Sequence, residues 1–532
     1  MKDAASSGLS GRFLGFLTTV LFLGLTLGAC DSALESDPPF TTSEDFYNNA
    51  EDALAAVNGA YAQTENLMLD NEFHGAMEFP TAAVLYEGGP RSSAGALNNF
   101  VMTPGNSVLS NIYQDSYVAV NRANAVLENV PGIESMDAGL RARIVAEARF
   151  LRALNYFNLV ALFGGVPLVE SEVVDLTDLE KPAASVADVY SLIIEDLQTA
   201  ISDLPPESSY SGDEIGRASE GAARTLLAKV YLQRGSLSAT NGVTGDLQIA
   251  QPGDYQSALD QLNQVINSGE YSLVSDYREL FVSPPTGGEI DEVVFALQSN
   301  YPAGVFASSG LPCDVSPKRS NLSAQNRDYF GSELPFFTSF PETDARRAAT
   351  FTTEYEIEGQ TVTYDAENPD GDGYEDFTPA FYKYGVAEER CADANDFLWL
   401  RYADVLLMKA EALNEINQGP TAAAYEAVNQ VQERAGAEPL ESGLGYEAFR
   451  EALYVERRRE LAFEGHGWRD GQRFFETFER RVEEVEGERF PAPYWIETVD
   501  VQDPKHRLMP IPQQALDRNS ELTQNPGYGA GN

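Results

Sequence analysis

The chain of 532 residues is poor in the side chains on which most catalytic and metal sites depend, with three histidines and three cysteines. His74, His466 and His506 are far apart and do not have the spacing of metal ligands. The sequence contains no His-Glu-x-x-His pair, no phosphate-binding glycine loop and no Ser-His-Asp signature. The sequence therefore gives no sign of a zinc peptidase, a nucleotide hydrolase or a serine hydrolase, and it predicts no required cofactor.

Positive charge is also scarce: 36 Lys and Arg stand against 82 Asp and Glu, for a net charge of −46. Lysine is represented only by Lys2, Lys181, Lys229, Lys318, Lys383, Lys409 and Lys505. Such a chain repels nucleic acid and anionic lipid, so neither is an expected partner. At 1 M salt, repulsion between charges is screened over about 3 Å, so a dispersed acidic surface suits high salt. The composition therefore predicts a protein from the acidic proteome of a halophile. An ordinary acidic exported protein is the alternative.

Long apolar runs are limited to Phe13 to Leu27, which is shorter than the roughly 20 residues that span a bilayer. Lys2 and Arg12 precede the run and Leu-Gly-Ala-Cys30 closes it, which is typical of a secretory signal. The closing tetrapeptide resembles the bacterial lipobox, whose cysteine is acylated. We therefore expect a lipoprotein signal peptide at 1–29, lipidation of Cys30 and a tether at 30–45. A plain signal peptide with an incidental cysteine is the alternative.

With Cys30 lipidated, Cys313 and Cys391 remain as an even pair. In an oxidising compartment they are candidates for one disulfide. Both lie in polar, loop-like surroundings, and the sequence does not place them near each other. Two free thiols therefore stay open as the alternative.

The full chain is 43% hydrophobic, and the part after the tether shows helical periodicity over most of its length. We divide it into a helical region at 46–240 and a second region at 241–532, the two forming one integrated fold. Helices are expected over 43–65, 107–129, 139–163, 185–204, 219–233, 255–267, 400–417, 422–435 and 446–464. Their pairing through short turns resembles tetratricopeptide-like hairpins. A loop-rich insertion at 284–395 carries strand-like pieces at 293–297 and 361–364, and such regions commonly bind ligands.

Two segments combine aromatic side chains with amides, as sugar binding requires. The first, Phe79–Phe100, and the second, Gln298–Phe330, supply the ligand-binding candidates Tyr86, Arg91, Asn98, Asn99, Asn300, Tyr301, Phe306 and Tyr329. Core packing is the competing role for each aromatic residue. No tryptophan falls in either segment, so an oligosaccharide or a peptide fits as well as a polysaccharide.

An acidic stretch inside the insertion resembles the calcium loop of an EF-hand. Its candidate ligands are Asn368, Asp370, Asp372, Tyr374 through its carbonyl, and Asp376. Position 12 of this loop is Pro379 rather than the usual glutamate, and no helices flank it. The stretch predicts a structural Ca²⁺ site, with a solvated acidic turn as the alternative.

Several stretches, in order and spacing, are similar to hallmarks of the SusD/RagB family of nutrient-uptake lipoproteins. They are Glu147–Ala153, Leu162–Val169, Ala223–Leu232, Arg401–Asn414, Glu456–His466, Met509–Pro512 and Gln524–Tyr528. After His466 the family usually continues Arg-Trp-Phe-Asp-Leu, whereas Gly-Trp-Arg-Asp-Gly stands at 467–471 here. The departure leaves the local packing of that turn open.

The resemblance implies a mostly α SusD-like fold, in which tetratricopeptide-like hairpins form a right-handed superhelical scaffold with a loop-rich ligand region. It implies a lipoprotein exposed on the surface of the outer membrane, attached to the membrane by its lipid anchor alone. Such a protein captures a glycan, an oligosaccharide or another oligomeric nutrient and delivers it to a SusC-like TonB-dependent transporter. It is not expected to be an enzyme.

Two other functions compete with this one. The first is a glycan-degrading helical enzyme, which would need two carboxylates about 5–9.5 Å apart. The sequence has many acids on its helices, and pairing of these acids with arginines between packed helices is the expected role of Glu147, Arg152, Arg401, Glu456 and Glu460. The second competitor is a repeat-type scaffold protein without a small ligand.

Overall fold

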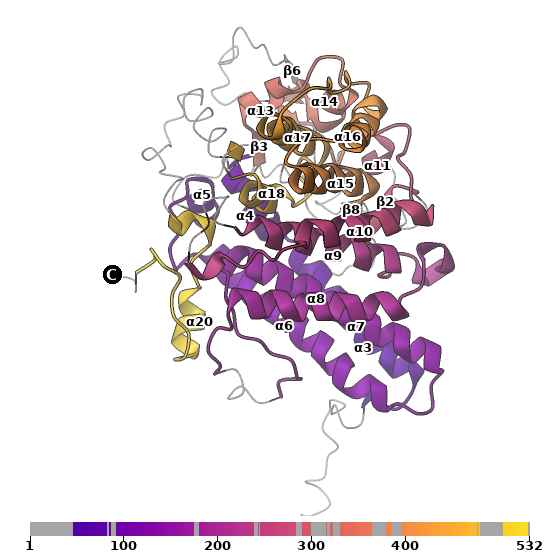
Figure 1. Cartoon of the computed structure of the whole chain (residues 1–532). Helices are drawn as coiled ribbons and strands as arrows, with labels where there is room; N and C mark the ends of the chain where they lie inside the picture. The colour runs from indigo at the N-terminus through magenta and orange to yellow at the C-terminus, as the bar shows by residue number, and fades with distance from the viewer. Residues whose placement is uncertain are drawn as a thin grey trace, which may run out of the picture.

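The computed structural model describes residues 46–81, 84–86, 92–174, 180–238, 243, 245–282, 290–298, 315, 320–322, 330–363, 379–385, 396–475, 477–478 and 504–529. The first half of this chain is a stack of helices that pack in sequence order (Figure 1). Its members are α3 (Ala50–Met68), α6 (Ser107–Asn129), α7 (Ala138–Phe163), α8 (Val186–Asp203), α9 (Glu220–Ser236) and α10 (Asp254–Ser268). Each helix contacts the next, as expected for consecutive hairpins. The mostly helical fold is therefore confirmed.

Side-chain caps set where these helices begin. The side chains of Asn49, Asn106, Ser185 and Ser219 accept backbone N–H groups at the starts of α3, α6, α8 and α9. The prediction that the first helix begins at Ser43 lies outside the described residues, and α3 is capped by Asn49 instead. At its other end, α7 is followed by Gly164 with φ of +73°, a conformation that stops the helix.

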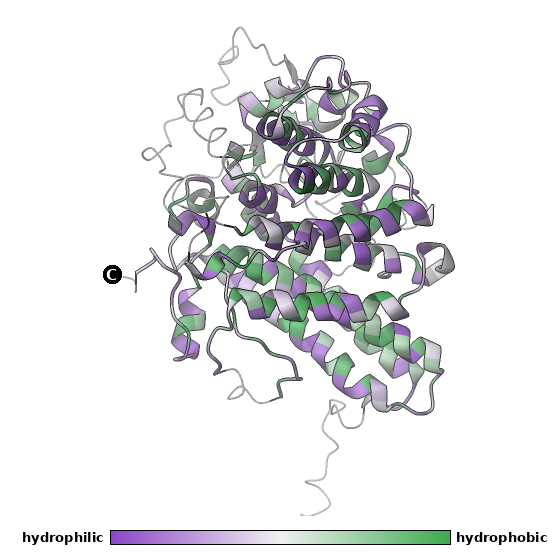
Figure 2. Cartoon of the chain, viewed as in Figure 1, coloured by the Kyte–Doolittle hydropathy of each residue, from purple (hydrophilic) through white to green (hydrophobic). Residues whose placement is uncertain are grey.

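The helices bury apolar side chains against one another. Figure 2 shows hydrophobic (green) and hydrophilic (purple) residues alternating along these helices. Helix α7 is buried over most of its circumference from Ile144 to Phe163, because α3, α6 and α8 all pack against it. It is therefore the central helix of the first half of the chain. Among the described residues, no helix has both the length and the apolar composition needed to cross a bilayer.

The second half continues the stack through α10, which packs on α15 (Tyr402–Asn417). Helices α16 (Ala422–Arg434) and α17 (Tyr446–Glu460) cover α15, and the short α18 (Gly467–Arg473) contacts α9 and α4 (Asn71–Glu78). The chain closes with η8 (Pro504–Arg507) and α20 (Gln513–Arg518), beside the first-half helices in Figure 1. The second half thus meets the first along α9, α10 and α4.

The described strands form four two-stranded antiparallel sheets. The pairs are β1 (Val84–Tyr86) with β3 (Phe330–Ser332), β2 (Val293–Leu297) with β8 (Phe397–Arg401), β4 (Phe351–Thr352) with β7 (Ala380–Phe381), and β5 (Glu354–Ile357) with β6 (Gln360–Thr363). Short helices α5 (Ser93–Asn98), α11 (Glu279–Val282), α13 (Leu334–Ser339) and α14 (Ala345–Thr350) lie between them.

The predicted helix start at 400 and the predicted helix end at 464 are wrong. Leu400 and Arg401 belong to strand β8 rather than to the helix that follows, because all five residues of β8 are buried and pair with the distant β2. Helix α17 ends at Glu460 rather than at Glu464, and residues 461–465 form a turn that leads into α18. Both errors occur where partners distant in sequence override local helical periodicity.

Charged side chains from the second half form a buried network. Arg401 contacts Glu292 at 2.5 Å, Glu460 at 3.0 Å and Glu464 at 2.7 Å. Arg346 joins the same network through Glu456 and Glu460, and Arg434 joins through Glu292 and Glu460. In the first half, Glu147 pairs with Arg217, and Arg152 pairs with Asp196. The predicted pairing of acids with arginines between helices is confirmed for Arg152, Glu456 and Glu460, whereas Arg401 lies in strand β8 and Glu147 pairs with an arginine outside the helices.

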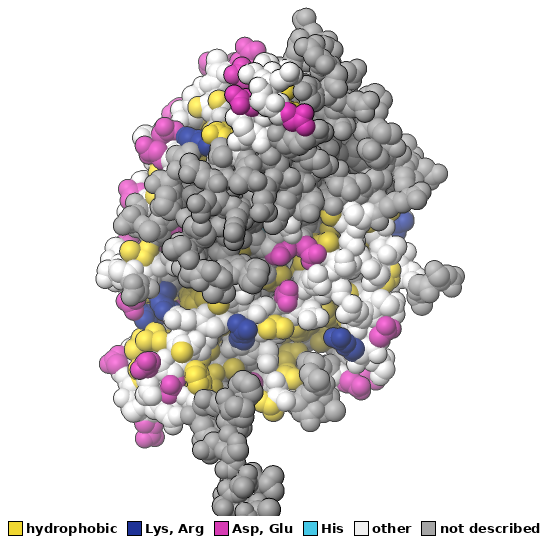
Figure 3. Space-filling model, turned by 180° about the vertical axis from the view of Figure 1, so that it is seen from behind, with side chains coloured by type: hydrophobic (Ala, Val, Ile, Leu, Met, Phe, Trp, Pro, Cys, Tyr) yellow, Lys and Arg dark blue, Asp and Glu magenta, His cyan; other side chains and the backbone are white. Residues whose placement is uncertain are grey.

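On the surface, acidic side chains are dispersed rather than gathered into one tail. In Figure 3, carboxylates are scattered around the described part of the face opposite Figure 1, with a few Lys and Arg side chains among them. The charge distribution predicted from the sequence therefore agrees with this view.

Candidate functional site

Strand pairing brings the two predicted ligand segments together. In the antiparallel pair β1–β3, Val84 is opposite Ser332 and Tyr86 is opposite Phe330. Phe79, at the start of the first segment, stacks on Phe330, at the end of the second, with ring centroids 4.9 Å apart. We call this place the β1–β3 junction, and it consists of β1, β3 and the elements that contact them.

Two predicted site residues, Asn98 and Asn99, lie at the end of α5 and are buried. The Asn98 side-chain amide donates to the carbonyl of Phe79 at 3.2 Å and of Val84 at 3.5 Å. It therefore ties the first residue of η1 (Phe79–Thr81) to the first residue of β1. In this structure Asn98 supports the junction from inside, and Asn99 is the buried residue that caps the end of α5.

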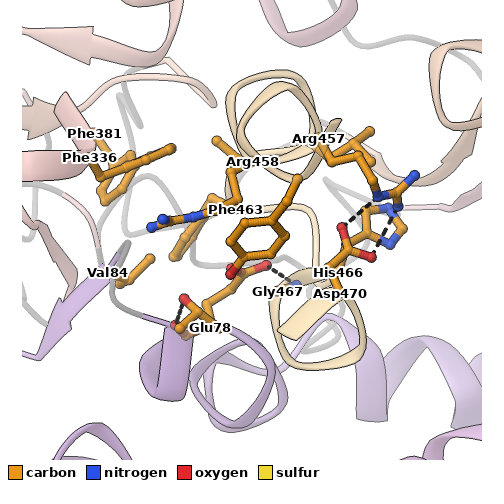
Figure 4. Close-up of a pocket in the computed structure, with 14 residues that line it drawn as sticks. Glu78, Val84, Phe336, Phe381, Arg457, Arg458, Phe463, His466, Gly467 and Asp470 are labelled. Carbon is orange, nitrogen blue, oxygen red and sulfur yellow. Dashed lines mark hydrogen bonds and ion pairs between the residues drawn. The ribbon is translucent and has the colours of Figure 1, made fainter. Parts of the chain in front are cut away.

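Below the junction, a buried carboxylate joins the first segment to the turn between α17 and α18 (Figure 4). Glu78 closes α4 and accepts the N–H of Gly465 at 2.8 Å and that of Gly467 at 3.5 Å. A Cβ atom on residue 467 would lie 2.6 Å from Glu78 Oε2 and 2.7 Å from Thr81 Cγ2. The departure from the family pattern at Gly467 therefore has a packing reason: a larger residue would collide with α4 and η1.

Two buried carboxyl groups beside this turn have pKa values that are shifted in opposite directions. Burial raises the pKa of Glu78 to about 8, although the N–H groups of Gly467 and Gly465 oppose the shift. Burial also acts to raise the pKa of Asp470, but the guanidinium groups of Arg457 and Arg473 lower it to about 2. One carboxyl at the junction is thus easily protonated, while its neighbour stays charged.

His466 lies between the two glycines of the turn and reaches into the helical stack. Its Nδ1 lies 3.1 Å from Nζ of Lys229 in α9, and that ammonium pairs with Asp404 at 2.7 Å. Burial holds the pKa of His466 well below its ordinary value, so the ring is neutral at pH 7. His466 thus packs inside the turn and links it to α9 and, through Lys229 and Asp404, to α15.

An aromatic wall stands beside the turn. Phe463 has a φ of +61°, which is strained for a side chain of its size, and its ring lies 5.0 Å from Phe330 and 5.3 Å from Phe381. The Arg458 guanidinium lies 4.9 Å from the ring centroid of Phe336. The cavity lined by these residues has a volume of about 20 Å³, enough for one water molecule. A sugar ring therefore has to bind outside this cavity.

Glu78, Phe463 and Arg458 belong to this site although the sequence does not mark them as binding residues. Phe463 and Arg458 belong to a family hallmark, and Glu78 immediately precedes the first ligand segment. The two glycines that flank His466 are the signal that could have found the turn, because a glycine beside a bulky residue indicates close backbone approach. Nothing in the sequence indicates that Glu78 is their partner, since the two parts of the chain are far apart.

Most of the remaining predicted site residues lie outside the described residues. They are Cys30, Arg91, Asn300, Tyr301, Cys313, Phe306, Tyr329, Asn368, Asp370, Asp372, Tyr374, Asp376 and Cys391. Of Tyr86 the structure describes only the backbone, in β1. The lipid anchor, the calcium loop and the disulfide therefore stay predictions.

Two family models match the chain. One, described as the SusD family, matches residues 324–528, and the other, described as "Starch-binding associating with outer membrane", matches residues 42–232. The chain belongs to the SusD family. Between them the two models contain both strands of the β1–β3 junction, so the junction is built from parts of the chain that the SusD models describe.

Relatives of known sequence or structure extend over nearly the whole chain. SusD-like protein P2 of Formosa agariphila is 29% identical over 546 residues, which cover 96% of this chain and 99% of that protein. A SusD superfamily protein from Parabacteroides distasonis is 25% identical with a TM-score of 0.72, covering 90% of this chain and 99% of that one. A structure described as a laminarin-binding SusD-like protein has a TM-score of 0.71 at 24% identity, covering 91% and 100%.

Proposed function

We propose that this SusD-family protein binds a glycan at the β1–β3 junction and releases it uncleaved. The observation that carries the proposal is the pairing of β1 with β3, which joins two segments rich in aromatic and amide side chains. Aromatic faces pack against sugar C–H groups, and amides exchange hydrogen bonds with hydroxyls. Tyr86, Arg91, Asn300, Tyr301, Phe306 and Tyr329 are the proposed ligand contacts.

The relatives support a glycan rather than a peptide. One SusD-like structure of the same fold is described as laminarin-binding, and the model that matches residues 42–232 is described as starch-binding. The charge of this chain narrows the choice further. At −46 it repels anionic polymers, so an uncharged glycan is the preferred class.

We further propose that the acyl chains on Cys30 hold the protein at the outer membrane, beside a SusC-like transporter. A tether between the lipid and the fold keeps the binding site at high effective concentration near one transporter. The Cys30→Ser variant should leave the membrane fraction for the soluble fraction. A variant that stays membrane-bound to the same extent would contradict the anchor. Recovery of a transporter barrel with the wild-type protein, from mildly solubilised membranes, tests the partner.

The stretch from Asn368 to Asp376 is proposed to hold a structural Ca²⁺ ion through the side chains of Asn368, Asp370, Asp372 and Asp376. Titration of the metal-free protein with Ca²⁺, followed by calorimetry, should give one site that the Asp370→Asn, Asp372→Asn double variant lacks. Equal binding by the double variant would contradict the site.

Affinity electrophoresis tests the central proposal. The mature protein should migrate more slowly in native gels that contain laminarin or starch, and it should release no reducing sugar on incubation with either. Release of sugar by the pure protein would favour a glycan-degrading enzyme. Unchanged migration over a broad glycan panel would favour a scaffold protein without such a ligand.

A further inference from the structure

A second pocket lies on the helical stack, away from the β1–β3 junction. It opens between the first turn of α9, the last turn of α10 and η4 (Glu207–Ser209), and its volume is about 180 Å³. Glu220 of α9 lines it, whereas Lys229, nine residues later, is the α9 residue that contacts His466 near the junction. At 1.5 Å per helical residue, the two positions are roughly 13 Å apart along α9.

The floor of the pocket is formed by the side chain of Tyr271, which packs directly on Gly221. The buried Tyr271 hydroxyl lies 3.1 Å from Oγ of Ser219, the N-cap residue of α9. A Cβ atom on residue 221 would lie 2.2 Å from that hydroxyl, so only glycine leaves room for the ring. The tyrosine and the helix start are therefore held together whether or not a ligand is present.

Carboxylates on separate walls are held in place by other groups. Glu270 accepts the N–H of Ser208 at 2.8 Å and its hydroxyl at 3.0 Å, and Glu220 pairs with Arg224 at 2.7 Å. Burial, with a smaller contribution from Glu270, raises the pKa of Glu207 to about 7, although a hydrogen bond with Ser219 opposes the shift. The exposed side chains of Gln264, Asn267 and Ser268 complete the rim. The walls thus offer many acceptors in fixed positions.

These features restrict the ligand. The pocket is lined by three glutamates and one arginine, and this excess of acidic groups disfavours binding of an anion. Nor is this a metal site, because within the described chain no three His, Cys, Asp or Glu side chains come close enough to hold an ion. A volume of about 180 Å³ far exceeds one water, yet it is below the roughly 300 Å³ where pockets for drug-sized ligands begin. A small molecule with hydroxyl donors around one ring meets all three restrictions.

We infer that this pocket is a second saccharide site, which takes a single uncharged sugar unit through hydrogen bonds from its hydroxyls to Glu207, Glu220 and Glu270. Two sites on one protein would let a long or branched glycan bind at both, and the second contact would then benefit from effective concentration. The inference goes beyond binding at the junction and uses none of the junction residues.

Ligand-observed saturation-transfer NMR on the mature protein tests the inference, with D-glucose, D-galactose, D-glucosamine and D-glucuronate as separate probes. We expect a signal from at least one neutral hexose and none from glucuronate.

Glu220→Gln should weaken hexose binding about tenfold, since a charge-assisted hydrogen bond is lost. Asn267→Leu, at an exposed helix position, should block the pocket without disturbing the fold. Glu195→Gln removes one charge from the exposed face of α8 and should bind like the wild type.

Three results would overturn the inference: no signal from any neutral hexose, hexose binding that neither pocket variant changes, and binding of glucosamine alone, which would indicate an ammonium site. Laminarin retardation is the separate readout of the junction. If laminarin does not retard the protein but hexose binding persists and depends on Glu220, the proposed function is wrong and the second site is supported. If laminarin retards the protein but hexose binding does not depend on the pocket variants, the proposed function is supported and the second site is wrong.

Discussion

Arg401 and Glu464 face each other through two hydrogen bonds in the core of the protein, Nε to Oε2 at 2.7 Å and Nη2 to Oε1 at 2.8 Å. Arg401 is the last residue of β8, and Glu464 immediately follows the strained Phe463. Lys383 also contacts Glu464, at 2.5 Å. The pair therefore connects two elements. One is the turn that carries the aromatic wall of the β1–β3 junction, and the other is strand β8, which immediately precedes α15.

Replacing Glu464 should be strongly destabilising. In Glu464→Gln, the buried Arg401 and Lys383 lose the charge of their shared carboxylate partner, so the free energy of unfolding should fall by about 3–5 kcal/mol. Urea denaturation followed by circular dichroism measures the change. The matched control is Glu441→Gln at an exposed position, with an expected change below about 0.5 kcal/mol. Equal stabilities of the two variants would contradict the role of the network.

Any side chain at position 467, in the turn between α17 and α18, should lower the stability of the fold. The Cβ atom of Gly467→Ala would press on Glu78, on Thr81 and, at 3.0 Å, on the backbone oxygen of Met77. We expect a loss of about 1–3 kcal/mol in the free energy of unfolding. The control is Gly59→Ala in α3, where a Cβ meets no atom within 4 Å and the better helix propensity of alanine should be neutral or stabilising. A Gly467→Ala protein as stable as wild type would show that the contact yields easily.

Glu78 should make the protein less stable as pH rises through the neutral range. Its pKa is about 8 when folded, against 4.5 as the ordinary value, so the folded protein retains a proton that the unfolded chain releases. Its contribution is complete below about pH 4.5 and is lost as pH rises to about 8, by up to about 1.4 kcal/mol per pH unit. The Glu78→Gln variant cannot ionise. The difference in unfolding free energy, variant minus wild type, should therefore increase from pH 5 to pH 8. A difference that does not change with pH would contradict the shifted pKa.

Salt should stabilise the fold. Repulsion among the dispersed carboxylates is screened to about 3 Å at 1 M salt, whereas the buried ion pairs are little affected. The midpoint of thermal unfolding should therefore rise from low salt to about 1 M KCl. Sucrose at equal osmolality is the control for general exclusion from the surface. A midpoint that rises as much in sucrose as in KCl, or that falls in KCl, would contradict the prediction of a halophilic protein.

The sequence predicted the helical scaffold well because local signals suffice for it. The predicted range 107–129 matches α6, and Ser185 and Ser219 cap α8 and α9 at the predicted ends. Non-local contacts explain what was missed. Strand β8 forms only because it pairs with β2, and Glu78 acquires its role only when Gly465 and Gly467 approach it. The two ligand segments were predicted separately, but only the paired strands show that they meet.

The pocket at α9 and α10 had no sequence signal at all. Glu207, Glu220 and Glu270 are three acids among 82, and they become a group only through the packing of η4, α9 and α10. Gly221 is the one position with a clear reason for its identity, and that reason is a tyrosine fifty residues later. Such relationships cannot be inferred from a single sequence.

Glycan binding without cleavage is the claim on which the account depends. The most direct measurement is affinity electrophoresis of wild type and of the Tyr86→Ala, Tyr301→Ala double variant in gels containing laminarin or starch. Val174→Ala, an exposed apolar residue outside both segments, is the control. We predict retardation of wild type and control by at least one glycan, at least tenfold weaker retardation of the double variant, and no released sugar. Retardation that the double variant retains in full, or sugar released by the wild type, would contradict the account.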